Sequence, residues 1–340
     1  MAWKFNFGRP YKITGNKENT IAECEEETND IKSKRWGKPF KDRRNWVPYN
    51  EELVARGEFL LELAWVKSWN KELEEMNAGK KGRPYGFPES LIRLQGVWHQ
   101  WIDYRGIEGI TRKLAEHGDL PKHNDFSTIS RRVNRLDIGF NLPRHGSVNV
   151  SCDGSGMKMA NSGEYKQDKY GKEERKWLRV KITADPKTKT LLACDVCIDG
   201  EGLSEPDTAI KHVRELINSE IRVEKLWGDG GYDKRELFNM CQRNRIETAI
   251  KLPKNATHIS RGSMRRSREV REYMEKGYRR WADDKEYGLR WVGTEGIFSA
   301  VKRKFGENVK SRKMQNIFHE ARSKFWAYQR MKNYAEAAVM

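Results

Sequence analysis

The sequence predicts an α/β protein in which a mixed five-stranded sheet with flanking helices follows an all-α region. Apolar residues recur at helical spacing up to about residue 140, whereas from residue 146 they alternate as they do in strands. Three strands then follow one another along the chain before helices and strands begin to alternate. These two changes of pattern separate a helical N-terminal part from a sheet-containing C-terminal part.

The first 76 residues contain two kinds of segment. Residues 1–45 are rich in Lys, Asn, Glu and Gly and predict a flexible basic arm. Residues 50–76 carry apolar side chains at the spacing of one amphipathic helix. Residues 78–88, AGKKGRPYGFP, then predict a basic linker.

Residues 89–140 predict several short helices, with Gly118 as a helix stop and Asp125 or Ser127 as the cap of the last helix. That last helix resembles the recognition helix of a helix-turn-helix motif, and an ordinary three-helix bundle with a charged outer face fits equally well. Residues 46–145 are therefore predicted to form a helical DNA-binding region. Its candidate DNA-binding residues are Arg131, Arg132 and Arg135.

The C-terminal part, residues 146–340, has the order of elements of an RNase H-like domain. Strands are predicted at VNVSCDGSG, WLRVKITADP, KTLLACDVCID, VEKLWGDGGY and TAIKLP, with helices before and after the fourth. Residues 254–286 form an Arg-dense, helical insert. Residues 294–305 predict a helix capped by Thr294, and residues 314–336 predict a C-terminal helix.

Charge and composition limit the function. The 340 residues carry a net charge of +17, which favours a polyanionic partner such as nucleic acid, although a well-solvated surface on a thermophilic or ribosome-associated protein would also explain it. No apolar run is long enough to span a bilayer and no signal core is present, so we expect a cytoplasmic, nucleoid-associated protein. The Cys-x-x-Cys of Cys194 and Cys197 lies in a predicted strand and indicates core packing rather than a zinc site.

Three acidic residues are candidates for phosphodiester chemistry, which two divalent ions held by carboxylates can catalyse. Asp153 lies in or at the end of the first strand beside glycines, where it could also simply begin a turn. Asp229 follows the fourth strand and is favoured over Asp233, which suits a helix N-cap. Glu295 begins a helix that carries Lys302 two turns later, and a solvated helix with mixed charges would look the same.

Together, DGSGMKM, GDGGYD and a late Tyr–Arg–Glu–Lys series resemble the insertion-sequence transposases of the DDE superfamily, in particular the IS4/IS5-type group. The resemblance covers roughly residues 40–336. It implies that Asp153, Asp229 and Glu295 are the catalytic residues and ligands of two Mg²⁺ or Mn²⁺ ions. It also implies supporting roles in DNA binding for Tyr287, Arg290 and Lys302.

One spacing departs from the family signature, because Arg290 precedes Glu295 by five residues rather than four. On a continuous helix five residues rotate by about 140° and four by about 40°, so the two side chains would not share a face. We therefore expect a helix that begins at Thr294 and leaves Arg290 in a loop.

The hypothesis from the sequence is a DNA transposase that binds the terminal inverted repeats of its element and catalyses metal-dependent strand cleavage and transfer. Its partners would be double-stranded DNA, as element ends and target, and further copies in a homodimer or larger synaptic complex. No nucleotide cofactor is expected, because no GxxxxGK[ST] loop is present. An RNase H-like structure-specific nuclease and a non-catalytic, domesticated transposase are the alternatives. The residues expected to hold phosphates are Lys302, Arg265, Arg266, Arg268 and Arg271.

Overall fold

The computed structural model describes residues 34–35, 38–39, 45–140, 142–143, 146–159 and 177–339. The chain divides into two compact units between Tyr49 and Asn50. In the first, β1 (Lys34–Arg35) pairs antiparallel with β2 (Lys38–Pro39), and helix α1 (Trp46–Glu58) begins. Nearly all of the predicted basic arm lies outside the described residues. The predicted domain boundaries remain a prediction.

The second unit contains a mixed sheet with the strand order β5-β4-β3-β6-β7. β3 (Ser147–Met159), β4 (Trp177–Asp185) and β5 (Thr190–Ile198) are antiparallel neighbours, whereas β6 (Arg222–Gly228) and β7 (Glu247–Ile250) continue the sheet in parallel. This is the predicted five-stranded, RNase H-like order, and it is confirmed. A sixth strand, β8 (Asn308–Val309), pairs with the end of β3.

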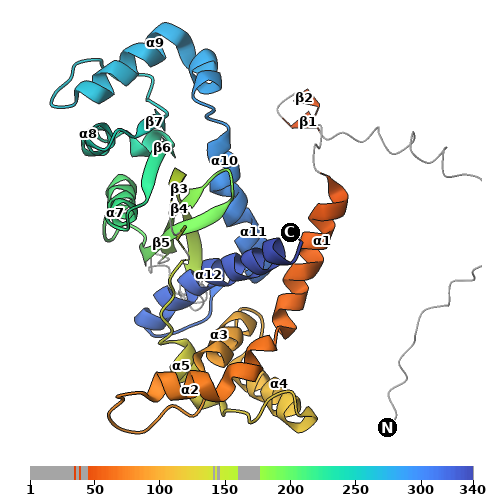
Figure 1. Cartoon of the computed structure of the whole chain (residues 1–340). Coiled ribbons are helices and arrows are strands. Elements are labelled where there is room, and N and C mark those ends of the chain that lie inside the picture. Colours follow the sequence, from red (N-terminus) through yellow and green to blue (C-terminus); the bar gives the residue numbers. More distant parts are fainter. Residues whose placement is uncertain are drawn as a thin grey trace, which may run out of the picture. The chain divides into compact units, whose positions relative to one another are not determined.

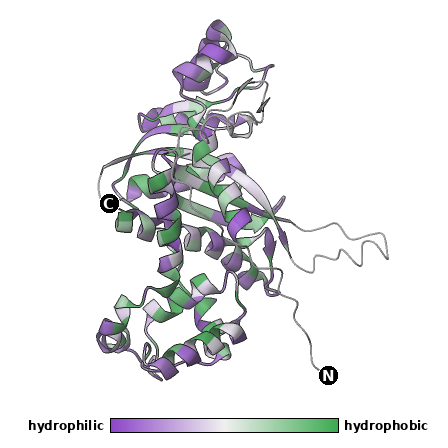
Figure 2. Cartoon of the chain, turned by 90° about the vertical axis from the view of Figure 1, so that its right-hand side faces the viewer, coloured by the Kyte–Doolittle hydropathy of each residue, from purple (hydrophilic) through white to green (hydrophobic). Residues whose placement is uncertain are grey.

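Helices cover both faces of the sheet (Figure 1). α7 (Glu205–Asn218) and α8 (Arg235–Arg243) lie over one face, and α11 (Glu295–Phe305) and α12 (Met314–Val339) lie over the other. Figure 2 shows the apolar residues gathered between these layers. Successive side chains of a strand point to opposite faces of the sheet, so the strands contribute to two cores. Val150 packs with α7 and α8 on one face, whereas Val180 packs with α11 and α12 on the other.

Four helices form the region before the sheet: α2 (Trp69–Asn77), α3 (Glu89–Trp98), α4 (Tyr104–His117) and α5 (Phe126–Val133). Gly118 ends α4 at a φ of 83°, and the Asp125 carboxylate caps α5 through the backbone N–H groups of Ser127 and Thr128, as predicted. Buried Gln95 and Asn124 exchange two side-chain hydrogen bonds and thereby join α3 to the start of α5.

The single helix predicted for residues 50–76 is wrong. The chain instead forms α1, two short 3₁₀ helices, η2 (Phe59–Leu61) and η3 (Ala64–Ser68), and then α2. Glu62 interrupts the helix because its carboxylate accepts the backbone N–H of Ala64 and its carbonyl accepts the indole N–H of Trp65. The break turns two apolar stretches toward different parts of the core, which helical spacing alone does not reveal.

Both cysteines of the Cys-x-x-Cys lie in β5. Cys194 is buried in the core that includes α12, as predicted, whereas Cys197 is only partly buried. Neither forms a disulfide. None of the described helices is long and apolar enough to cross a membrane.

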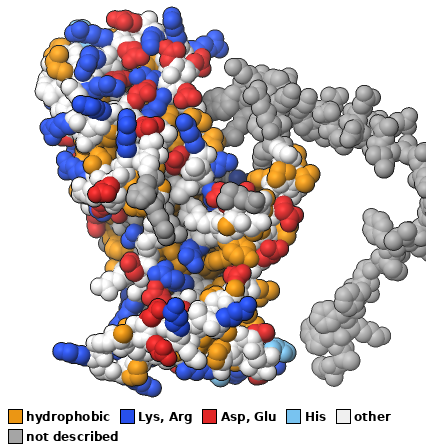
Figure 3. Space-filling model, viewed as in Figure 1, with side chains coloured by type: hydrophobic (Ala, Val, Ile, Leu, Met, Phe, Trp, Pro, Cys, Tyr) orange, Lys and Arg blue, Asp and Glu red, His pale blue; other side chains and the backbone are white. Residues whose placement is uncertain are grey.

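The predicted insert is helical, since α9 (Met264–Asp284) runs through it with a kink at Gly277, where φ is 69°. Figure 2 shows α9 as mostly hydrophilic, and in Figure 3 Lys and Arg side chains stand among Asp and Glu side chains around it. The insert is nevertheless anchored to the sheet, because Val270 and Trp281 are buried.

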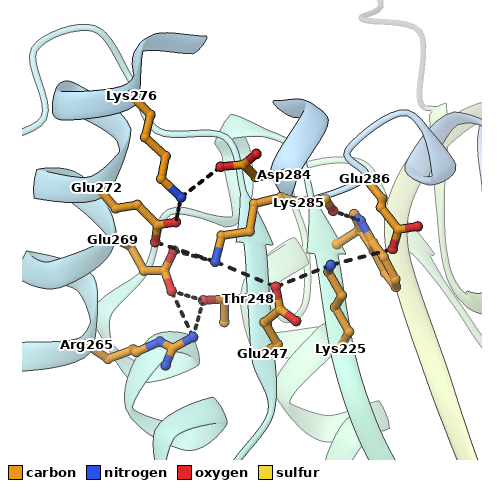
Figure 4. Close-up of polar contacts among 11 residues, drawn as sticks. Lys225, Glu247, Thr248, Arg265, Glu269, Glu272, Lys276, Asp284, Lys285 and Glu286 are labelled. Atoms are coloured by element: carbon orange, nitrogen blue, oxygen red, sulfur yellow. Dashed lines mark hydrogen bonds and ion pairs between the residues drawn. The ribbon is translucent and has the colours of Figure 1, made fainter. Parts of the chain in front are cut away.

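A network of ion pairs joins α9 to β6 and β7 (Figure 4). The buried ammonium of Lys285 lies 3.6 Å from carboxylate oxygens of Glu247 and Glu269 and 3.5 Å from one of Glu272. The carbonyl of Lys285 accepts the indole N–H of Trp227 on β6 at 3.1 Å. One residue therefore connects the end of the insert to both neighbouring parallel strands.

We predict that Lys285→Met lowers the free energy of unfolding by about 3 kcal/mol, because it removes a buried cation from the buried carboxylate of Glu269 and from the more exposed carboxylates of Glu247 and Glu272. Denaturant unfolding followed by circular dichroism measures the change. The matched control is Lys276→Met, since this lysine also pairs with Glu272 but is more exposed, and its effect should be much smaller. Equal effects of the two substitutions would contradict the prediction.

Candidate active site

The three predicted carboxylates come from separate elements of the second unit. Asp153 lies in β3 at the centre of the sheet, Asp229 directly follows β6, and Glu295 is the first residue of α11. β3 and β6 are parallel neighbours whose register places Ser151 opposite Trp227. Asp153 and Asp229 each lie two residues beyond this pair, so they lie at the same level along the two neighbouring chain segments.

Arg290 lies between two of these carboxylates. Its Nη1 is 3.6 Å from Oδ2 of Asp153, and its Nη2 is 3.0 Å from Oε1 of Glu295. The predicted loop position of Arg290 is wrong, because the residue lies in a short helix, α10 (Leu289–Gly293). α10 and α11 are separate helices, so the rotation expected along a continuous helix does not apply and the five-residue spacing brings the side chains together.

Gly293 explains why the chain breaks between α10 and α11. A Cβ at this position would lie 2.8 Å from Cα of Pro186 and 3.2 Å from Cβ of Ser151. Only a glycine allows the junction to pack this closely on β3 and on the turn after β4. The contact therefore determines where Arg290 and Glu295 meet Asp153.

Thr294 occupies the predicted N-cap position of α11, but its side chain makes no capping hydrogen bond. The fully buried hydroxyl instead lies 3.3 Å from Oδ2 of Asp153 and 3.0 Å from the carbonyl of Arg290, with both oxygens as acceptors. The sequence does not reveal this contact with Asp153. A threonine directly before a helix looks the same whether its hydroxyl caps that helix or donates to a distant carboxylate.

The electrostatics of the site are centred on Asp153. Burial raises the pKa of its carboxyl to about 6, and the negative charges of Asp229 and Glu295 act in the same direction. The backbone N–H of Gly154 and the guanidinium of Arg290 lower that pKa and offset part of the rise. Asp229 and Glu295 thus disfavour the negative charge on Asp153, and a bound cation would offset this repulsion.

A fourth carboxylate was also missed. Glu205, at the start of α7, lies against the backbone of Gly154, where a Cβ would overlap it, and accepts a 2.7 Å hydrogen bond from Nε of Arg179. The sequence showed Glu205 only as part of a helix start. Its cation partner is Arg179, whereas Asp153 and Glu295 share Arg290.

Asp233 does not have its predicted role as an N-cap, because α8 begins one residue later, after Lys234. Its carboxylate forms two hydrogen bonds, of 2.6 and 2.7 Å, with the guanidinium of Arg266 in the insert. Asp229 is left to face the site, and its carboxylate accepts only the backbone N–H of Gly231 among the hydrogen bonds of the described residues.

Tyr287 and Lys302 lie on either side of Arg290 and Glu295 in the sequence. The Tyr287 hydroxyl donates to the carbonyl of Gly228 at 3.2 Å, and the Arg290 guanidinium lies 5.6 Å from the ring centroid. This contact joins the segment before Arg290 to the end of β6. Lys302 is half-buried on α11, two turns after Glu295.

The other predicted DNA-binding residues occupy two kinds of position. Arg131 and Arg135 are exposed, whereas Arg132 is half-buried with its guanidinium 4.4 Å from the Tyr85 ring centroid. Arg265 is paired with Glu269 at 2.8 Å, and Arg266 with Asp233. The two arginines of the insert therefore already have anionic partners within the chain, and their contacts with DNA remain a prediction.

The donor chemistry of the site suits Mg²⁺ or Mn²⁺, because all three candidate ligands are carboxylates. Within the part of the chain that the structure describes, no three His, Cys, Asp or Glu side chains lie close enough together to hold a metal ion. Arg290 contacts both Asp153 and Glu295 and offsets part of their negative charge. Its Nε is buried and has no hydrogen-bond partner among the described residues, so it retains one free donor.

Comparison with known protein families agrees with this geometry. A family described as Transposase DDE domain matches residues 145–330, which is more than half of the chain. A second family with the same description matches residues 54–162. The chain therefore belongs to the DDE transposases, a family that generally uses divalent metal ions and acts on DNA.

The raised pKa of Asp153 should make the stability of the metal-free protein depend on pH. Because burial raises this pKa from 3.8 to about 6, the carboxyl stabilises the fold below about pH 4, and that contribution is lost as the pH rises through 6. Asp153→Asn cannot ionise, so at about pH 7 it should be more stable than the wild type by up to about 3 kcal/mol. Near pH 4 the difference should disappear.

Urea unfolding in the presence of a chelator at both pH values measures this difference. Asp137→Asn serves as the control, because Asp137 is exposed and its substitution should change little at either pH. A gap between wild type and Asp153→Asn that is the same at both pH values would rule out ionisation as its cause.

Proposed function

We propose that this protein is the transposase of an insertion sequence of the IS4/IS5-type group, which binds the terminal inverted repeats of its own element. It hydrolyses a phosphodiester at each end of the element, and the freed 3′ hydroxyl then attacks target DNA in line. The observation that supports this most is the meeting of Asp153 and Glu295 around Arg290, with Asp229 directly after β6, the strand that pairs with β3.

Asp153, Asp229 and Glu295 are the residues that would hold two divalent ions, which when bound supply activation of the attacking oxygen and stabilisation of the leaving oxygen. The protein itself positions these groups. Thr294 restrains Asp153, Tyr287 holds the segment before Arg290 on β6, and Gly293 allows α11 to approach the sheet.

Arg290 has a distinct role in this proposal. In the protein without DNA it balances the charge of Asp153 and Glu295. If divalent ions took over these two carboxylates, its Nη1 and Nη2 would be free to donate to a phosphate oxygen of the scissile group, since arginine binds phosphate through several donors at once. Lys302, on the same helix as Glu295, supplies a second cation for the DNA backbone.

The remaining DNA contacts would come from the helical region and the insert. Arg131 and Arg135 are exposed on or after α5, and Arg268 and Arg271 are exposed on α9. The net charge of +17 favours binding to DNA throughout. Because both element ends are cut together, we propose that a homodimer or larger synaptic complex is the active form.

The first test is cleavage of a duplex that carries the element end, in Mg²⁺. Asp153→Asn, Asp229→Asn and Glu295→Gln should each lower the cleavage rate by at least about a thousandfold, because each removes an ionised ligand. Glu286→Gln is the matched control, since Glu286 is an exposed carboxylate of the ion-pair network and should retain wild-type cleavage.

Wild-type rates in all three variants would overturn the proposed function. Cleavage without joining of the 3′ end to a second duplex would indicate a structure-specific nuclease. Tight, salt-sensitive binding with no metal-dependent cleavage would indicate a non-catalytic DNA-binding protein.

Thr294 provides a finer test. Thr294→Val keeps the shape of this buried side chain but removes the hydroxyl near Asp153, so cleavage should fall by about tenfold with little change in DNA affinity. Thr294→Ser keeps the hydroxyl and should recover most of the rate. If serine and valine lower the rate equally, the hydroxyl does not position Asp153.

A further inference from the structure

The loop between α2 and α3, residues 78–87, is anchored at its base. The side chain of Asn77 donates to the carbonyl of Tyr85 at 3.0 Å and accepts the backbone N–H of Tyr85 at 2.7 Å. At the end of the loop, the Phe87 ring packs edge-on against buried Trp69, with 6.4 Å between centroids. These contacts fix both ends of the loop on the helical region.

The tip of this loop is basic and narrow. Lys81 and Arg83 are exposed and form no ion pair with any other described residue, and residues 78–88 contain no acidic residue. Arg83 lies between Gly82, which has no side chain, and Pro84. Gly79 and Gly82 adopt φ values of 66° and 89°, and a Cβ at either position would meet nothing within 4 Å. No side chain therefore covers the backbone at these two glycines, so a binding partner can approach Arg83 closely.

Arg132 connects the loop to α5. Its guanidinium lies 4.4 Å from the Tyr85 ring centroid, Lys80 lies 4.7 Å from the same centroid, and Nη1 of Arg132 donates to the carbonyl of Phe87 at 3.4 Å. The loop and the proposed DNA-reading helix thus share one surface. In Figure 1 the loop projects beyond the end of α2.

We infer that this loop enters the minor groove of A·T-rich duplex DNA, with Arg83 reading the groove, while α5 faces the adjacent major groove. The inference rests on the proposed function and names the part of the DNA that the helical region reads. A·T-rich minor grooves are narrow and strongly negative, so they attract arginine, whereas the guanine N2 amine of G·C pairs obstructs the groove floor. A helix in the major groove combined with a basic arm in the neighbouring minor groove is a known mode of DNA recognition.

Base substitution separates the two grooves. Full-length protein is titrated with three short duplexes that have identical flanks and cores of A·T, inosine·cytosine or G·C pairs. Inosine·cytosine presents the major groove of G·C but lacks the minor-groove amine. The wild type should bind the A·T and inosine·cytosine duplexes about tenfold more tightly than the G·C duplex.

Arg83→Ala should remove this preference and leave affinity for the G·C duplex nearly unchanged. Arg83→Lys keeps the charge and should remove only part of the preference. Arg214→Ala, an exposed arginine on α7, is the matched control and should behave like the wild type. Circular dichroism checks that each variant is folded.

Three outcomes would overturn the inference. Equally weakened binding of all three duplexes by Arg83→Ala would indicate a phosphate contact. Inosine·cytosine binding that follows G·C binding would indicate major-groove reading, and an unchanged preference in Arg83→Ala would show that Arg83 does not read the groove. These outcomes leave the proposed function intact if the wild type still cleaves the element-end duplex and the carboxylate variants do not.

Discussion

The close packing of the α10–α11 junction on β3 is the constraint on which the candidate active site depends. A Cβ at Gly293 would overlap Pro186, in the turn after β4, and would crowd Ser151 of β3. This approach places the hydroxyl of Thr294 beside Asp153 and the guanidinium of Arg290 between Asp153 and Glu295. The close approach of the backbone at Gly293 to the sheet therefore brings residues from distant parts of the chain together in one site.

The insert strengthens this constraint. It enters from β7 and leaves toward α10, and its end is tied to β6 twice, through Trp227 to the carbonyl of Lys285 and through Tyr287 to the carbonyl of Gly228. Both contacts immediately precede Asp229. Buried ion pairs contribute little net stability compared with apolar packing, but they penalise any misplacement that separates the charges. The network around Lys285 therefore favours one register between the insert and the sheet.

Most of the fold could be predicted from the sequence, because strand alternation and helical spacing are local properties. The carboxylates Asp153 and Asp229 were found because glycines and strand ends mark them along the chain. The sequence could not show that Thr294 faces Asp153, that Glu205 packs on Gly154, or that Arg290 meets Glu295 across a helix break. These contacts depend on how separate helices and strands pack together, and the spacing of residues along one helix does not predict that packing.

The charges of the protein impose opposite demands on the site. A net charge of +17 attracts DNA, but the site itself concentrates carboxylates, and burial raises the pKa of Asp153 to about 6 because its charged form is poorly solvated. Arg290 reduces this repulsion without metal, since its single positive charge lies between Asp153 and Glu295. A cation that bound these carboxylates would compete with Arg290 for them. The guanidinium would then be free to pair with phosphate, so that cation binding and DNA binding would favour each other.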